Sequence, residues 1–182
     1  MGQITPPHLV KLIVGMLSPD EKLFTWAQEE MQMLWGPIDI FSEIMPFTQT
    51  SYYEKEMGPG LLRKFVGFEN LIDPGRLAAI KHDSNKLEEQ YAQNPASQEQ
   101  VVQRPINLDP GYIDPSKLVL ATTKNYSHRI YIGQSMYAEA TLHYHKGSWQ
   151  SWPYTYPDYA SGAYNDFFNQ VRQQLMSQLH PE

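Results

Sequence analysis

The feature that most constrains the fold is a strand signal followed directly by a helix signal near the N-terminus. Residues 9–17, LVKLIVGML, form an apolar run rich in β-branched side chains, which predicts a buried strand. Ser18-Pro19-Asp20-Glu21 follows, with a serine before a proline and a glutamate three positions on, the pattern of a capping box. We therefore expect a helix that starts at Ser18, whose hydroxyl accepts a hydrogen bond from the Glu21 amide.

This predicted helix runs to about Trp35, where Gly36-Pro37 ends it, and a strand over residues 38–45 follows. Its expected buried stripe consists of Leu23, Ala27, Met31 and Leu34.

The same alternation then repeats. A long polar and aromatic connection, residues 47–63, leads to a predicted strand at 64–72. Asp73-Pro74-Gly75 predicts the start of a second helix, with the aspartate as its cap.

The second half of the chain reads mainly as strands. Residues 101–113 are extended but broken by Asp109-Pro110-Gly111, which is typical of a turn. Three strands joined by short turns follow, and a last helix begins at Ala160. The strand that ends near Thr123 and the one that starts near Arg129 are expected to be antiparallel neighbours, because their connection is too short for a parallel crossover.

This order predicts an α+β fold: a ferredoxin-like βαββαβ core, extended by an antiparallel meander, with a C-terminal helix. Residues 1–182 are expected to form a single domain. The chain has no cysteine, which excludes disulfides, thiolate metal sites and a cysteine nucleophile. We expect a cytoplasmic protein, because the N-terminal apolar run is too short to span a membrane and lacks the features of a signal peptide.

The polar turn at residues 122–129 is the first candidate site. It lies in a stretch, from Lys117 to Tyr137, that has three positive charges and no carboxylate, in a chain of net charge −6. Lys124 and Arg129 would hold an anion, and Thr123 would add a hydroxyl donor. The alternative is a solvated turn or a structural ion pair. The acidic balance argues against general nucleic-acid binding.

Four more residues complete the predicted cleft. Asn107 and Asp109 would face the turn from an adjacent strand, unless they only stabilise a turn of their own. Tyr53 and Glu54 lie in the long connection, where function is common, although charges there also protect sheet edges. His128 or Asp109 would carry a proton if the site is catalytic.

Other chemistries find little support. His143 and His145 share a strand with Glu139, but we expect no metal site. The sequence has no P-loop, no dinucleotide-binding glycine motif, no nucleophile elbow and no zincin motif, so the cofactor stays unknown.

Several segments together resemble one family. They are VKLIVGMLS, SYYEKEMG, RKFVGFENLI, RPINLDPGYI, KLVLATTKNYSHRIYI, YAEATLHY and TYPDY. In this order and over nearly the whole chain, they are similar to the family known as domain of unknown function 4416. The resemblance implies a full-length, single-domain member and brings no mechanism. Some members carry the label GTP-binding protein, whereas this sequence has neither a P-loop nor an Asn-Lys-x-Asp motif.

Two functions therefore remain open. The first is binding of a small anionic ligand, phosphorylated or nucleotide-like, through the 122–129 turn, with or without catalysis. The second is a non-catalytic protein-interaction module that uses the aromatic loop at residues 149–159. Its aromatic residues are Trp149, Trp152, Tyr154, Tyr156 and Tyr159. The oligomeric state is not predicted.

Overall fold

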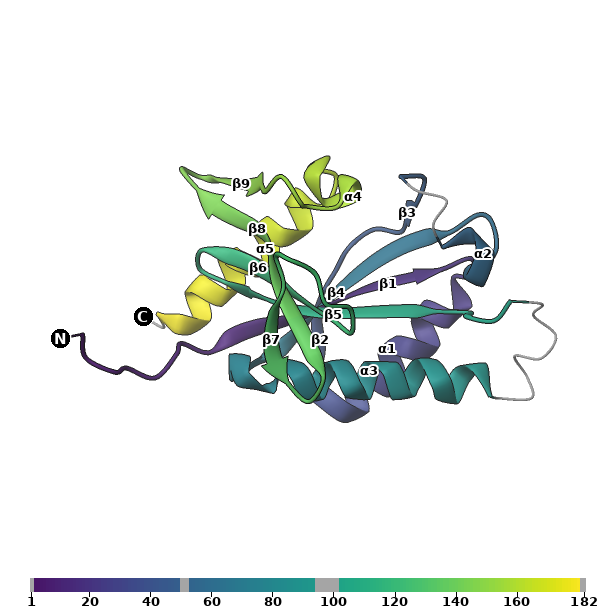
Figure 1. Ribbon diagram of the computed structural model, residues 1–182, viewed down its shortest axis with the longest axis horizontal. Helices are drawn as coiled ribbons and strands as arrows, with labels where there is room; N and C mark the ends of the chain where they lie inside the picture. Colours follow the sequence, from purple (N-terminus) through teal and green to yellow (C-terminus); the bar gives the residue numbers. More distant parts are fainter. Residues whose placement is uncertain (1, 50–52, 94–101, 181–182) are drawn as a thin grey trace.

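The computed structural model describes residues 2–49, 53–93 and 102–180 (Figure 1). Its strands are β1 Val10–Ser18, β2 Ile38–Phe41, β3 Met45–Pro46, β4 Leu62–Ile72, β5 Asn107–Asp114, β6 Lys117–Thr122, β7 Ile130–Gly133, β8 Met136–His145 and β9 Ser148–Ser151. Its helices are α1 Lys22–Trp35, α2 Glu54–Met57, the 3₁₀ turn η1 Pro74–Arg76, α3 Leu77–Ala92, α4 Pro157–Ala160 and α5 Asn165–Leu179.

The strands form one open antiparallel sheet in the order β2-β4-β1-β5-β6-β8-β7, with β3 paired to β4 and β9 paired to β8. Side chains of α1 and α3 pack on one face of the central strands, and those of α5 pack on the other. Figure 1 shows α1 and α3 together below the strands. The prediction of a mixed helix and antiparallel-sheet protein with a C-terminal helix is confirmed.

The strand β1 is buried along its whole length, because helices cover both faces of the sheet where it lies. Leu12 and Val14 pack with Phe24 of α1, whereas Ile13 packs with Phe168 of α5. A strand with two apolar environments needs no polar face, which explains the continuous apolar run in the sequence.

The predicted helix cap at Ser18 is wrong. Ser18 is the last residue of β1, and its buried hydroxyl donates to the Pro105 carbonyl at 2.9 Å and accepts from the Asp20 amide at 3.1 Å. Asp20 takes the expected role instead, since its Oδ1 accepts from the Lys22 amide at 2.9 Å. The Ser18 hydroxyl therefore donates to the Pro105 carbonyl, which is distant in sequence, and does not cap the helix as the local pattern predicted.

The buried stripe of α1 is nearly as predicted. Leu23, Ala27 and Met31 are buried, but Leu34 is 49% exposed and Trp35 takes its place in the core. The expected second strand is divided into β2 and β3, which both pair with β4.

The second helix begins as predicted. The Asp73 carboxylate accepts from the Gly75 amide at 2.7 Å, with Pro74 as the first residue of η1. The η1 turn leads directly into α3.

The predicted turn at Asp109-Pro110-Gly111 is wrong, because all three residues lie inside β5. A Cβ on Gly111 would stand 2.3 Å from the Val119 carbonyl oxygen, so the glycine allows β6 to approach closely. The β5–β6 pairing starts at Gly111, which leaves Pro110 paired only with Val14 of β1. A proline without an N–H is thereby accommodated in an interior strand.

The predicted pairing of β6 with β7 is also wrong. Thr122 of β6 and Tyr131 of β7 both pair with Tyr137, so β8 lies between the two strands. β8 is ten residues long and pairs with β6 along one edge and with β7 along the other. The segment 123–129 therefore crosses from one side of β8 to the other. The predicted meander is wrong for these strands, because β7 and β9 pair with opposite ends of the same edge of β8, and β6 pairs with its other edge.

The C-terminal helix α5 starts later than predicted, after the short helix α4. Its buried residues are Phe167, Phe168, Val171 and Leu175. Within the described part of the chain, no helix combines the length and apolarity needed to cross a bilayer.

Candidate functional site

Polar side chains gather where β1 ends and β4 and β5 begin. Leu17 of β1 pairs with Arg63 on one side and with Asn107 on the other. Ion pairs connect this region with Lys81 and Glu88 of α3, Asp158 of α4 and, through Arg104, with Glu56 of α2. We call this group the Arg63 cluster; it consists of Tyr53, Arg63, Lys81, Glu88, Arg104, Asn107, Asp109, Asp158, Tyr159 and Tyr164.

Arg63 is the centre of the cluster and is almost completely buried, with 3% of its side chain exposed. Its Nη1 lies 3.6 Å from Asp109 Oδ2, and its Nη2 lies 3.5 Å from Asp158 Oδ2. The rings of Phe47 and Phe65 lie 5.0 and 5.6 Å from the guanidinium carbon. Burial alone would lower the pKa of Arg63, but Tyr159 and the two carboxylates raise it, so the residue stays charged.

The guanidinium has unused hydrogen-bond donors. Nε and Nη1 of Arg63 have no hydrogen-bond partner among the residues that the structure describes, nor does the buried Tyr159 hydroxyl. Unpaired buried donors on a charged group are unfavourable, and they are rare without a ligand or water to accept from them.

Gly15 gives Arg63 its path across the sheet. It pairs with Phe65 of β4 and Asp109 of β5, and a Cβ on Gly15 would stand 3.2 Å from Arg63 Nη1. The missing side chain therefore lets the guanidinium pass over β1 toward Asp109. A glycine inside an apolar strand is the sequence signal for such a close approach.

Asp109 connects Arg63 to a second cation. Its Oδ2 accepts from Asn107 Nδ2 at 2.6 Å, and its Oδ1 lies 3.8 Å from Lys81 Nζ. Lys81 is buried and also donates to the Leu108 carbonyl at 2.8 Å. The Asp109 side chain is 26% exposed, so it is accessible to solvent although both of its cationic neighbours, Arg63 and Lys81, are buried.

Arg104 is the most exposed cation of the cluster, at 31%. Its Nε and Nη2 donate to Glu88 Oε2 at 2.9 and 2.7 Å, and its Nη2 also donates to the Asn107 side chain. Burial raises the pKa of Glu88, although Lys81 and Arg104 oppose this effect.

Three tyrosines surround these charges with raised pKa values. Burial raises the pKa of Tyr164 to about 12, and burial is also the main cause of the raised pKa of Tyr53 and Tyr159. Burial likewise raises the pKa of the Asp158 carboxyl, which accepts from the Tyr164 hydroxyl at 3.3 Å. All three phenols are therefore neutral donors at physiological pH.

The 122–129 turn is organised around a carboxylate that its own sequence lacks. Glu139 of β8 accepts at Oε2 from Arg129 Nε at 2.7 Å, and His128 Nε2 lies 3.1 Å from the same oxygen. Arg129 Nη1 also donates to the Lys124 carbonyl at 3.1 Å. Arg129 is thus buried in an ion pair, whereas Lys124 and Thr123 are exposed.

The aromatic loop lies against this turn. The His128 and Tyr154 rings stack at 4.3 Å, and Arg129 Nη2 donates to the Tyr156 hydroxyl at 3.0 Å. Burial and then Asp109 raise the pKa of Tyr53, and Tyr156 adds a smaller effect in the same direction. The regions of the two competing hypotheses are therefore neighbours.

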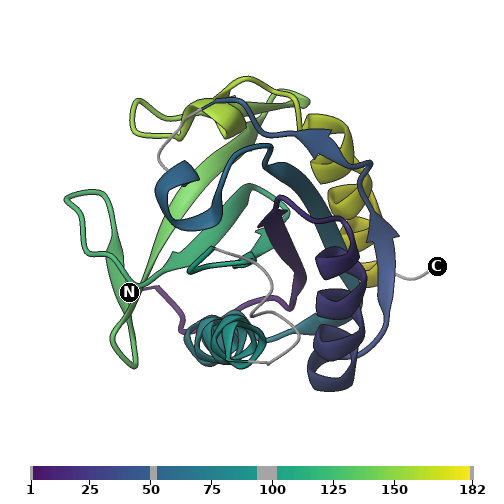
Figure 2. The ribbon, with the colours of Figure 1, turned by 90° about the vertical axis from the view of Figure 1, so that its right-hand side faces the viewer.

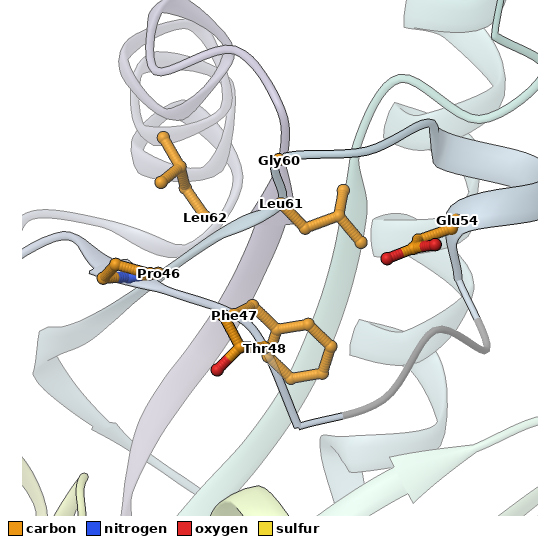
Figure 3. A pocket seen from close by; sticks show the side chains of 7 residues that line it. All are labelled: Pro46, Phe47, Thr48, Glu54, Gly60, Leu61 and Leu62. Atoms are coloured by element: carbon orange, nitrogen blue, oxygen red, sulfur yellow. The ribbon is translucent and has the colours of Figure 1, made fainter.

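Each sequence-predicted residue can now be placed. Tyr53, Asn107 and Asp109 belong to the Arg63 cluster, and Thr123, Lys124, His128 and Arg129 belong to the turn. Glu54 lies apart, in an open pocket of about 380 Å³ beside Phe47 (Figure 3). The other residues of that pocket are Pro46, Thr48, Gly60, Leu61 and Leu62.

Sequence reasoning missed five charged members of the cluster: Arg63, Lys81, Glu88, Arg104 and Asp158. Arg63 was detectable in principle, because it occupies an inward position of the strand β4. Of the described residues, no three His, Asp or Glu side chains are arranged to hold a metal ion.

Comparisons with curated proteins and with solved structures give no match. A family model described as "Domain of unknown function (DUF4416)" matches residues 8–175, which span β1 to α5 and include the Arg63 cluster and the 122–129 turn. By this match over nearly its whole length, the chain belongs to the DUF4416 family.

Proposed function

We propose that this protein binds a small anionic ligand, phosphorylated or nucleotide-like, at the Arg63 cluster. The observation that carries the proposal is the buried Arg63 guanidinium, whose Nε and Nη1 donate to no described residue. Oxygen atoms of an anion would accept from these donors in the planar geometry that guanidinium groups favour.

The composition of the cluster supports directional rather than long-range attraction. Arg63, Lys81 and Arg104 are balanced by the carboxylates of Glu88, Asp109 and Asp158, and the further pair of Arg104 with Glu56, at 4.0 Å, is exposed and adds little. A site without net charge exerts little steering, so recognition would depend on N–H and O–H donors in fixed positions. The neutral phenols of Tyr53 and Tyr164 would add such donors.

The anchoring residues differ from those expected from the sequence. Arg129 donates to Glu139, to the Lys124 carbonyl and to the Tyr156 hydroxyl. We therefore propose that the 122–129 turn does not hold the anion itself but positions Tyr156 of the aromatic loop. For a catalytic reaction we propose Asp109 as the proton carrier, because it is partly exposed and adjacent to the unused donors. His128, stacked on Tyr154 and held by Glu139, is less accessible.

Isothermal titration calorimetry with orthophosphate, pyrophosphate and ATP, each without metal, would test the proposal. We expect at least one probe to bind with an affinity that falls in high salt, and Arg63→Lys, which keeps the charge but removes the planar set of donors, to weaken it at least tenfold. Lys86→Ala, at an exposed pair with Asp83, is the control and should bind normally. Loss of binding in Lys124→Ala but not in Arg63→Lys would place the site at the 122–129 turn. The absence of binding for every probe would refute the proposal.

The aromatic loop gives less support to an interaction module. Trp149 and Tyr159 are buried in the core around α5, and only Trp152 and Tyr156 are substantially exposed. A hot spot needs a larger contiguous aromatic surface than these two side chains offer.

A ferredoxin-like core is a further proposal. The order β2-β4-β1-β5, with antiparallel neighbours and with α1 and α3 packed on one face, supports it. Experimental coordinates with these helices on opposite faces would contradict it.

A further inference from the structure

We propose that a second pocket, between the β8–β9 hairpin and α5, binds a small hydroxylated carboxylate through Arg172. The open pocket has a volume of about 400 Å³ and is lined by Tyr144 and Gly147 of the hairpin and by residues of α5. It shares no residue with the Arg63 cluster, so the inference does not depend on the function proposed above. In Figure 2, α5 runs in yellow along the right of the molecule, away from α3 in teal at the bottom.

Arg172 is the cation of this pocket, and part of its guanidinium is unused. Its Nε donates to the Pro115 carbonyl at 2.8 Å, and its guanidinium carbon lies 3.8 Å from the centre of the Tyr144 ring, a cation–π contact that holds the group in place. Within the described part of the chain, no carboxylate forms an ion pair with Arg172, and Asp114, next to Pro115 in sequence, is paired with Lys117 at 2.7 Å. Nη1 and Nη2 are therefore available to the two oxygen atoms of one carboxylate.

The surroundings of Arg172 lack the acid that usually accompanies an exposed arginine. On a helix, a carboxylate three or four positions away would stabilise the cation. Those four positions of α5 hold neutral residues: Phe168, Asn169, Leu175 and Met176. The hairpin and the loop after it, from Ala140 to Pro157, contain no carboxylate and place Lys146 beside Gly147. In a chain of net charge −6, this pocket is thus a locally positive place that attracts an anion.

The neutral groups beside Arg172 suit the hydroxyl groups of a ligand. The side chains of Asn169 and Gln173 line the pocket, are exposed, and form no hydrogen bond with a described residue. Each amide both donates and accepts, as a hydroxyl group does. The Ser177 hydroxyl donates to the Gln173 carbonyl at 3.2 Å and keeps its capacity to accept. This set of groups favours a hydroxy acid over an inorganic anion, whose oxygen atoms mainly accept.

The pocket is formed before any ligand arrives. The Tyr144 ring meets the Trp149 ring edge-on at 5.2 Å, and the Tyr144 amide donates to the Ser116 carbonyl at 2.7 Å. Lys146 and Gly147, with φ of 48° and 84°, form the tight turn of the hairpin. The other wall, α5, is anchored in the core by its buried residues. Little ordering is required on binding, which lowers its entropic cost.

An amide NMR titration with D-gluconate tests the proposal. We expect gluconate, at up to about 10 mM, a range that covers weak small-molecule sites, to shift the amide signals of Gly147 and Arg172. D-glucose, which carries similar hydroxyl groups without a carboxylate, should leave these signals unchanged. Orthophosphate should affect them less than gluconate, because it cannot use the amides of Asn169 and Gln173 as donors and acceptors at once.

Two variants separate the role of Arg172 from a general effect of charge. Asn169→Asp supplies the missing carboxylate three positions before Arg172, so it should occupy the guanidinium and weaken gluconate binding roughly tenfold or more at an unchanged melting temperature. Arg172→Lys keeps the charge but removes the planar pair of donors and should weaken binding by a similar factor. Arg76→Gln, which removes an exposed arginine of η1, is the control and should bind normally, as should Arg63→Lys.

Four results would overturn the proposal. They are the absence of gluconate binding, equal shifts with D-glucose, tighter binding of orthophosphate than of gluconate at the same amides, and unchanged gluconate binding in Asn169→Asp.

Discussion

Gly15 lies beneath the guanidinium of Arg63, and a Cβ at this position would stand 3.2 Å from Arg63 Nη1 and 2.9 Å from Phe65 Cε1. Gly15→Ala should therefore destabilise the protein by about 1–3 kcal/mol, because the added methyl group overpacks the core. Gly67→Ala is the control, since a Cβ there has its nearest neighbour at an ordinary 3.4 Å. Urea unfolding measures both; equal stability losses would mean that Gly15 does not make room for Arg63.

Glu139 and Arg129 should behave as a coupled, structural ion pair. Both side chains are nearly buried and lie 2.7 Å apart, so Glu139→Gln leaves an unbalanced cation and should reduce the free energy of unfolding by about 3 kcal/mol. Arg129→Met should cost a similar amount, and the double variant should cost less than the sum of the two. Additive losses in this cycle would indicate that the pair is not coupled and would free Arg129 for an anion.

Ser18 and Asp20 should have separate roles that exchange measurements can distinguish. Ser18→Ala leaves the Pro105 carbonyl without its buried donor and should cost about 1–2 kcal/mol in thermal unfolding. Asp20→Ala should cost about 1 kcal/mol and speed amide exchange in the first turn of α1, because it removes the acceptor for the Lys22 amide. Faster exchange there in Ser18→Ala alone would restore the original capping interpretation.

Asp114 should give the protein stability that is lost in acid. Burial would raise the pKa of its carboxyl, but hydrogen bonds from Lys117 and Ser116 outweigh burial and lower the pKa below its ordinary value of 3.8. A lowered folded-state pKa stabilises the protein above the unfolded pKa, and this contribution disappears as the pH falls through the folded value. The difference in unfolding free energy between the wild type and Asp114→Asn should thus be large at pH 7 and shrink below about pH 4.

Urea unfolding at several pH values measures this difference. Asp83→Asn, at the exposed pair with Lys86, is the control for removal of a carboxylate. A wild-type advantage over Asp114→Asn that grows as the pH falls would contradict the prediction.

The sequence predicted features that depend on a few neighbouring residues. The apolar run of β1 and the Asp73 cap before α3 both follow from local patterns, because side-chain spacing and capping act within one or two turns. Family membership was predictable for the same reason, since it rests on short segments in a fixed order.

The tertiary structure decided which distant groups meet. Asp109-Pro110-Gly111 has turn chemistry, yet it lies inside a strand, because β1 pairs with all three residues and β6 pairs with Gly111. Arg129 was expected to bind an anion, but the pairing of β8 in the sheet places the Glu139 carboxylate 2.7 Å from its Nε. The sequence by itself determined where most strands and helices lie, whereas only the packed sheet placed Arg63 between Asp109 and Asp158, because pairing and burial depend on the whole chain at once.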